Sequence, residues 1–313
     1  KTFIRFVDRG TGHISEAATD AASIKKISNT TIPKVYEAIW GANRSVVLRY
    51  TDEPDTVRNY LAFPLASTSD PLPALGGTPL STDLATVSFS PSKDSLFYLQ
   101  KNSTGIEGVV WKIGDTKRTT IFSSPISAWI TDWQNQNNIS LTIKATHGAQ
   151  GFLYFLNPAT GAMKKILGGM LGLTTLTDPT ATHVLFSKDE TDIFSLYSLD
   201  VKTGSQQLLT RPTLPEKCVW SKRQQGVAYC AVPRSIPEGK YPDDWYMGKI
   251  SFADALWKIN TRTGAYTEIM VSEKEAPKQL DATNLMVNDK ETVLIFLNKI
   301  DGSLWSLDLT GTN

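Results

Sequence analysis

Short apolar segments recur along the whole chain, each followed by polar residues. One pattern, apolar-aromatic-x-apolar-Asp/Asn, occurs at residues 153–157 (LYFLN), 196–200 (LYSLD), 256–260 (LWKIN) and 304–308 (LWSLD). A degenerate copy, VWKI, lies at residues 110–113. Segments of this length, rich in aromatic and branched residues, are typical of β-strands, and no stretch has the apolar period of a helix. The pattern predicts an all-β protein built from repeats.

The turns and the partner strands repeat as well. Thr-Gly follows three of the copies, at residues 160–161, 203–204 and 263–264, where Asn/Asp-x-x-Thr-Gly predicts a turn with a left-handed glycine. Pairs of apolar segments joined by a polar turn lie at residues 38–51, 87–100 and 218–232. Four short strands in each unit of roughly 40 to 50 residues predict the blades of a β-propeller.

The strand positions favour seven blades. Innermost strands are expected to begin near residues 33, 84, 126, 173, 217 and 281, which gives five complete blades and a last partial blade at about 281–309. Residues 13–28 align without gaps to residues 152–167, so 3–8, 13–17 and 24–28 are expected as strands two to four of a partial first blade, about 3–30. The first strand of that blade would lie before Lys1. Residues 1–313 then form a single propeller domain; the alternative is six blades with an extra N-terminal hairpin.

The composition adds exclusions. The chain is 41% hydrophobic and 20% charged, as expected for a globular protein with an ample core. Its 32 basic and 31 acidic residues leave a net charge of +1, which gives no field to attract nucleic acid. The sequence has neither an apolar run long enough to span a bilayer nor a signal-peptide pattern. We expect no nucleic-acid partner and no membrane insertion by this segment; an anchor, if there is one, lies upstream of residue 1.

Two cysteines occupy neighbouring expected strands. If Ser221 faces Val227 across their turn, antiparallel pairing places Cys218 directly opposite Cys230. Directly opposed Cα atoms lie about 4.5 to 5.5 Å apart, a separation that a disulfide accepts. The alternative is a pair of buried free thiols. A metal site is not expected from these two residues alone, because a structural zinc needs four ligands.

The Ser90-Pro91 turn and the repeated Leu/Val-Trp/Tyr-x-Leu/Ile-Asp/Asn strand resemble the repeats of TolB-type, WD40-like propellers of bacterial envelopes. Residues 217–259, with KCVWS, YCAVP, YPDDWY and ALWKIN, are similar to uncharacterised extracytoplasmic propeller proteins of bacteria with small genomes. The resemblance implies an extracytoplasmic location: periplasmic, cell-surface or secreted. A disulfide would agree with such an oxidising compartment. Propellers host enzymes, binders and scaffolds alike, so the resemblance does not imply an activity.

The eight tryptophans separate into framework and insertion. Seven are expected in the blades, six at repeated strand positions and one in an inner strand: Trp40, Trp111, Trp133, Trp220, Trp257, Trp305 and Trp129. Trp245 differs because it lies in the one large insertion within a blade, between strands that end near Val232 and start near Ala255. The candidate binding residues of this insertion are Tyr241, Asp243, Asp244, Trp245 and Tyr246.

A stiff, aromatic insertion with two adjacent acids could contact a sugar, a peptide or a basic partner. Trp245 would stack on the ligand, and Asp243 and Asp244 would accept hydrogen bonds. In the alternative interpretation the insertion merely covers the blade, with its rings turned inward and its acids exposed.

The search for catalytic motifs identifies no catalytic, metal-binding or cofactor-binding residue. The nucleophile elbow, the zinc-helix motif, the phosphate loop and the sialidase Asp box are all missing. His13, His147 and His183 fall on different blades. The acidic cluster of Asp189, Glu190 and Asp192 weakly resembles a calcium-binding loop, but a solvent-exposed turn is the favoured interpretation.

The sequence therefore favours a non-enzymatic binding or scaffold propeller that engages a protein or glycan at the cell surface through one face. The alternative is a hydrolase or lyase acting on polysaccharide. Its carboxylates would come from different blades and converge at the central channel, an arrangement that sequence spacing cannot show.

Overall fold

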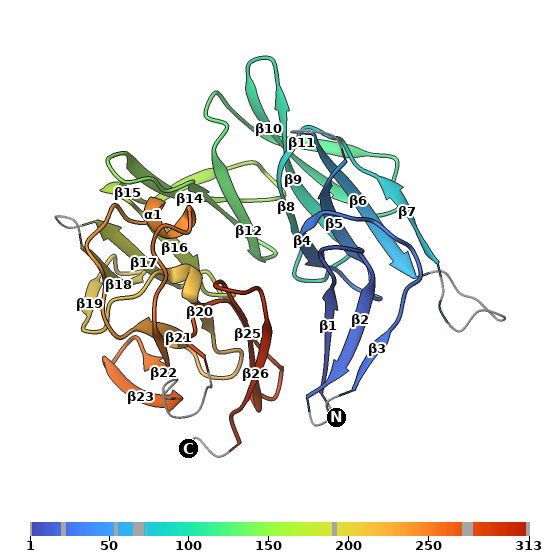
Figure 1. The fold of residues 1–313 in the computed structure, drawn as a ribbon. Helices are drawn as coiled ribbons and strands as arrows, with labels where there is room; N and C mark the ends of the chain where they lie inside the picture. Colours follow the sequence, from blue (N-terminus) through green and yellow to red (C-terminus); the bar gives the residue numbers. More distant parts are fainter. Residues whose placement is uncertain are drawn as a thin grey trace. The chain divides into compact units, whose positions relative to one another are not determined.

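The computed structural model describes residues 2–19, 23–52, 56–64, 72, 74–189, 193–270 and 278–310. In these ranges the strands form seven sheets, five of four strands and two of three (Figure 1). Besides strands, the same ranges hold one short helix, α1 (Asp243–Tyr246), and one 3-10 turn, η1 (Pro215–Lys217), and no helix in them is long and apolar enough to cross a membrane. The chain is an all-β, seven-bladed β-propeller, which confirms the predicted fold class.

The chain divides into two compact units, residues 1–139 with 156–162 (unit 1) and residues 140–155 with 163–313 (unit 2). Three sheets lie wholly in unit 1. They are β1–β2–β3 (Phe3–Val7, Ile14–Ala18, Ile24–Lys26), β4–β5–β6–β7 (Val35–Trp40, Val46–Thr51, Val57–Pro64, Leu75–Pro79) and β8–β9–β10–β11 (Leu84–Phe89, Ser95–Asn102, Gly105–Lys112, Arg118–Ser124).

Three further sheets lie wholly in unit 2. They are β16–β17–β18–β19 (Thr174–Thr177, His183–Asp189, Phe194–Asp200, Gln206–Leu209), β20–β21–β22–β23 (Cys218–Trp220, Val227–Pro233, Asp254–Asn260, Ala265–Met270) and β24–β25–β26 (Ala282–Val287, Val293–Asn298, Leu304–Asp308). The fourth sheet along the chain contains the division between the units. Its strands are β12–β13–β14–β15 (Trp129–Asn135, Asn138–Ile143, Gln150–Leu156, Met163–Leu171).

The second strand is the most buried in four of the five four-stranded sheets, and in β8–β9–β10–β11 the first strand is. In β21 all seven residues are buried, and in β17 the first five are. A strand in the middle of a sheet that is covered on both faces needs apolar side chains on both, so it reads as a continuous apolar run. Third strands such as β18 alternate more, with buried Phe194 and Leu196 separated by half-buried Ser195. This contrast underlies the repeat seen in the sequence.

The repeated Asn/Asp-x-x-Thr-Gly turn has the expected geometry. The Asp200 carboxylate accepts hydrogen bonds from the backbone N–H groups of Lys202 and Thr203, at 2.9 and 2.8 Å. Gly204 then adopts a φ of 74°, a left-handed conformation in which a side chain would be strained. Asn157 with Gly161 and Asn260 with Gly264 repeat the arrangement, with φ of 73° and 72° at the glycines.

The N-terminal strands form a sheet of their own. β1 pairs with β2 in register from Phe3 opposite Ala18 to Val7 opposite Ile14, and β2 pairs with β3. The six-bladed alternative expects only a two-stranded hairpin at the N-terminus. The three-stranded sheet β1–β2–β3 is instead a blade, so the propeller has seven blades. The innermost strands of the following blades begin at residues 35, 84, 129, 174, 218 and 282, close to the positions expected from the repeat.

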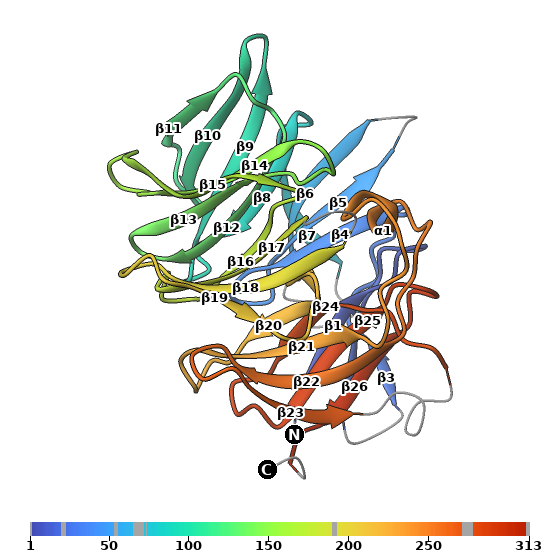
Figure 2. The same cartoon turned by 90° about the vertical axis from the view of Figure 1, so that its left-hand side faces the viewer.

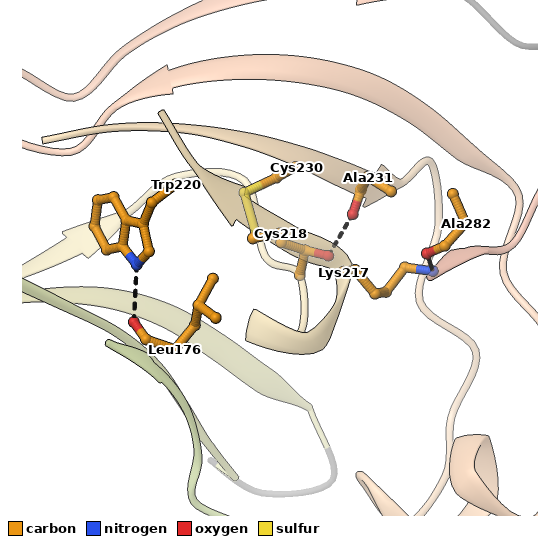
Figure 3. Close-up of a disulfide and its surroundings, with 8 residues drawn as sticks. Leu176, Lys217, Cys218, Trp220, Cys230, Ala231 and Ala282 are labelled. Carbon is orange, nitrogen blue, oxygen red and sulfur yellow. Dashed lines mark hydrogen bonds between the residues drawn. A yellow bond between two sulfur atoms is a disulfide. The ribbon is translucent and has the colours of Figure 1, made fainter. Parts of the chain in front are cut away.

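A disulfide joins β20 to β21 in unit 2. Cys218 lies opposite Cys230 in the strand register, with 4.1 Å between the Cα atoms, as the antiparallel numbering predicted. Figure 3 shows the bond beside Trp220, whose indole N–H donates to the carbonyl oxygen of Leu176 at 3.1 Å. Both cysteines are buried. Figure 2 shows β20, β21, β22 and β23 side by side as the sheet that the disulfide fastens.

Replacing both cysteines with serine is expected to lower the free energy of unfolding by about 3 kcal/mol. The bond closes a short loop, with a sequence separation of 12, and loop-closure entropy for such a loop has about this value. Denaturant unfolding of the wild type and of the Cys218→Ser, Cys230→Ser variant measures the difference. Alkylation of the unreduced, unfolded wild type is the control, and two labelled thiols there would contradict the disulfide.

Candidate functional site

The large insertion predicted from the sequence lies between β21 and β22, at residues 234–253, and contains α1 (Figure 1). It belongs to the end of unit 2 where β16, β20 and β24 begin and where β13, β17 and β21 end. We call this end the insertion face. It comprises the described residues of the insertion, of the β13–β14 turn and of the segments that lead into β16, β18, β20 and β24. Loops that meet at one end of a rigid β scaffold are a common location for binding residues.

The aromatic rings of the insertion are turned inward. Trp245 is 3% exposed and Tyr241 is 1% exposed, and both belong to a buried cluster with Phe194, Leu214 and Phe252. The Tyr241 ring lies 4.9 Å from that of Phe194, and the Trp245 ring lies 6.2 Å from that of Phe252. Tyr241 and Trp245 therefore do not present a free ring face on which a ligand could stack.

The two adjacent acids of the insertion are anchors. Asp243 accepts hydrogen bonds from the Thr146 hydroxyl at 2.8 Å and from the backbone N–H of His147 at 2.5 Å, which fastens α1 to the turn between β13 and β14. Asp244 accepts from the backbone N–H of Lys240 at 2.9 Å and from the Lys249 ammonium at 3.2 Å. These hydrogen bonds, first that of the Lys240 backbone, lower the pKa of the Asp244 carboxyl. Both acids bind the protein's own chain.

Tyr246 makes a third anchor. Its hydroxyl donates a short hydrogen bond to Oε1 of Glu216, in η1. Burial raises the pKa of the Glu216 carboxyl, and burial together with the nearby Glu216 charge raises the pKa of the Tyr246 hydroxyl. The pair joins the end of α1 to the segment that leads into β20.

A buried lysine lies beneath the insertion. Lys217 has no exposed side-chain surface, and its ammonium contacts Asp254 at 2.8 Å and Asp281 at 2.5 Å. It also donates to the carbonyl oxygen of Ala282 at 3.0 Å, a contact visible in Figure 3. The same ammonium lies 5.2 Å from the ring centroids of Trp245 and Phe252, within cation–π range.

Asp281 links this charge to the insertion. Its carboxylate accepts the indole N–H of Trp245 at 3.0 Å and the backbone N–H of Phe252 at 3.2 Å, both through Oδ2. Asp254 accepts the backbone N–H of Ala282 at 2.7 Å, while its other oxygen, Oδ1, is buried and has no hydrogen-bond partner among the described residues. Burial raises the pKa of Asp254 to about 6, against the attraction of Lys217.

One histidine of the three meets an acid at this face. Nδ1 of His147 lies 2.5 Å from Oδ2 of Asp189, whose side chain is 5% exposed, whereas the His147 side chain is 27% exposed. The pair brings together the β13–β14 turn and the end of β17. Within the described ranges, no three His, Cys, Asp or Glu side chains gather as metal ligands. Glu190 and Asp192 of the acidic run lie outside the described residues.

The sequence did not indicate Lys217, Glu216, Asp254 and Asp281 as members of a site. The available signal was their position: each is a charged residue at or next to the start of an expected strand in otherwise apolar surroundings. A charge at such a position needs a partner when it is buried. The partners come from segments far apart in sequence, so the spacing along the chain does not reveal them.

No protein-family model matches the chain, and no curated protein does. Solved propeller structures do match. The chain is similar to TolB from Acinetobacter baumannii, at 14% identity over 82% of this chain and 59% of that one, with a TM-score of 0.53. It is also similar to an oligogalacturonate lyase from Vibrio parahaemolyticus, at 8% identity over 100% and 98%, with a TM-score of 0.62.

A puromycin-hydrolyzing peptidase from Mycobacterium tuberculosis matches at 12% identity over 94% of this chain and 48% of that one, with a TM-score of 0.58. The chain thus spans about three fifths of the TolB structure and about half of the peptidase. At these identities the likeness establishes the fold alone. It confirms the resemblance to TolB-type propellers and leaves the activity open.

Replacing Asp254 with asparagine is expected to remove a pH dependence of stability. Because burial raises the pKa of Asp254 from its ordinary 3.8 to about 6, the folded protein holds this proton more tightly than the unfolded chain. The resulting stabilisation is complete below about pH 4 and is lost as the pH rises through about 6.

The measurement is the free energy of unfolding of the wild type and of Asp254→Asn across this pH range. The wild type should lose stability relative to the variant between about pH 4 and pH 6. A constant difference between the two proteins would show that Asp254 does not hold its proton in this way.

Proposed function

We propose that this protein is an extracytoplasmic binding or scaffold propeller that engages a protein or glycan through the insertion face. The observation that carries the proposal is the fixed conformation of the insertion. Asp243, Tyr246 and Trp245 each hydrogen-bond to a different segment of unit 2. A surface ordered before its ligand arrives loses little conformational entropy on binding, so it binds more tightly than a mobile loop with the same contacts.

The insertion residues then act in two ways. Tyr241 and Trp245 set the shape of the face from below, and Asp243 and Asp244 hold the backbone in place. The ligand would meet the side chains that remain outside, including half-buried Tyr246 and exposed Ala149 and Met247. Direct contact by Tyr246 stays a prediction, whereas stacking on the ring of Trp245 would require the insertion to move.

The proposed location rests on the disulfide and on the fold. Structural disulfides persist in oxidising compartments and are rare in the cytosol. The bond between Cys218 and Cys230 is buried in the sheet that bears the insertion, as expected of a structural bond. The similarity to TolB agrees with a place in the cell envelope, in the periplasm, at the cell surface or outside the cell.

A polysaccharide-acting enzyme is the second candidate, and the pair of His147 and Asp189 favours it. The buried carboxylate of Asp189 lies 2.5 Å from Nδ1 of His147, so the other imidazole nitrogen, Nε2, is the candidate base. A general base of this kind suits hydrolysis or elimination, and one similar structure is an oligogalacturonate lyase. In this version the base is a histidine at the insertion face, whereas Asp254 and Asp281 are occupied by Lys217.

The test is a screen of the purified protein on arrays of glycans and cell-surface extracts. The variant Ala149→Trp places a bulky ring on the insertion face, and Ser205→Trp is the matched control in the turn between β18 and β19, at the other end of unit 2. Both positions are exposed in the wild type. Ala149→Trp should weaken binding about tenfold or more, equivalent to about 1.4 kcal/mol, and Ser205→Trp should not.

Equal binding by both variants and the wild type would contradict the insertion face as the binding surface. Analysis of the captured glycans after incubation separates the two candidates. Unchanged chains support a binding protein, and shortened or unsaturated chains support the enzyme.

A further inference from the structure

The insertion face separates its charges by sign. Three of its described carboxylates are engaged within the protein: Asp189 with His147, Asp243 with Thr146 and His147, and Glu216 with Tyr246. The side chain of Asp244 is 17% exposed, while that of its partner Lys249 is 63% exposed. The acids thus serve the internal structure, and much of their charge is withdrawn from the surface.

The exposed charges of the face are mostly basic. Lys144 precedes the β13–β14 turn, and Lys240 and Lys249 flank α1; all three are exposed. Nearer the start of the insertion, Arg234 and Glu238 are also exposed, and in the β25–β26 turn exposed Asp301 pairs with Lys278 at 3.2 Å. Among the described residues, a ligand that approaches α1 therefore meets ammonium groups ahead of carboxylates.

Three exposed apolar side chains lie at the same end of unit 2. Met247 directly follows α1 and is 60% exposed, and Ile193 and Leu171 are 56% and 43% exposed. Ile193 precedes Phe194, whose ring packs on Tyr241, and Leu171 precedes Gly172, where an added Cβ would lie 2.9 Å from the carbonyl oxygen of Tyr241. Ile193 and Leu171 are therefore chain neighbours of residues that lie close to Tyr241, and Met247 directly follows the helix that Tyr241 precedes. Exposed apolar side chains that gather on one surface are typical of protein interfaces, and methionine is enriched there.

We propose that the insertion face is a docking surface for an acidic segment of a partner protein that carries apolar side chains. The inference rests on the proposed binding function and names its partner class. The apolar side chains of the segment would cover Met247, Ile193 and Leu171, and its carboxylates would lie near Lys144, Lys240 and Lys249. Burial of the apolar groups supplies affinity, and the charges supply attraction at a distance and specificity.

The same features favour a protein segment over an acidic glycan. Sugars are commonly bound on an open aromatic ring, and here the rings of Tyr241, Trp245 and Phe252 are covered. An acidic glycan would use the lysines but would leave the methionine, isoleucine and leucine side chains without apolar partners. The lysines would attract an acidic glycan as well as an acidic protein segment. The exposed apolar side chains are therefore the feature that favours the protein segment.

The experiment uses fluorescence anisotropy with three labelled probes: a synthetic peptide of alternating glutamate and leucine, polyglutamate, and polygalacturonate. The test variants of the full chain are Met247→Asp and the double variant Lys144→Glu, Lys240→Glu. The matched controls are Met163→Asp and Lys164→Glu, Lys165→Glu, at exposed positions of β15. None of these residues belongs to the buried cluster around Lys217, so each variant is expected to fold.

The glutamate–leucine peptide should bind the wild type more tightly than either of the other probes, and its affinity should fall with added salt. Each test variant should weaken it about tenfold or more, while each control stays within about twofold. Absence of peptide binding, equal loss in the controls, or tighter binding of polygalacturonate would overturn the inference.

The failures of the two proposals are distinguishable. If the array ligand is lost in Ala149→Trp while the glutamate–leucine peptide does not bind, the insertion face is a binding surface and the partner class is wrong. If Ala149→Trp and the charge variants have no effect on any ligand, the proposed function is contradicted together with the inference.

Discussion

An ammonium group removed from water must be paired, because an unpaired buried charge costs several kcal/mol or more. Lys217 is fully buried in unit 2, and its ammonium is paired with Asp254 and Asp281. These partners come from the first residue of β22 and the residue before β24, and Lys217 itself ends η1. One buried charge thereby fixes the starts of three strands relative to one another.

The insertion depends on the same charge. Asp281 holds the indole of Trp245 and the backbone of Phe252 while it neutralises Lys217. The cluster holds two carboxylates and one ammonium group. Burial, together with the nearby Asp281 charge, raises the pKa of Asp254. The polar contacts of Asp243 and Tyr246 fasten the first and last residues of α1. The aromatic and acidic side chains of the insertion thus pack against or hydrogen-bond to the protein itself. The side chains exposed around them are mostly lysines and a few apolar residues.

The repeat made much of this architecture predictable from the sequence. Strand positions, the left-handed glycines and the opposition of Cys218 and Cys230 follow from local periodicity and antiparallel register, which need information from a few neighbouring residues. The orientation of the insertion does not follow in that way. A tryptophan and two adjacent acids are as typical of an open binding loop as of a closed one. The closed conformation is held by hydrogen bonds to Asp281 and Thr146, which lie far away in sequence. The exposure of Met247 and Lys249 follows from that conformation, so the sequence alone could not indicate it.

Hydrogen exchange of the insertion in a Lys217→Met variant tests the central role of the buried charge most directly, with Lys222→Met as the control at an exposed lysine. Removing one partner of a buried charge cluster is expected to cost about 3 to 5 kcal/mol. We predict that backbone amides of residues 241–252 exchange much faster in Lys217→Met, while strands of unit 1 keep their protection and Lys222→Met matches the wild type. Unchanged protection of residues 241–252 in Lys217→Met would contradict the central role of the buried charge and would mean that aromatic packing alone holds the insertion in place.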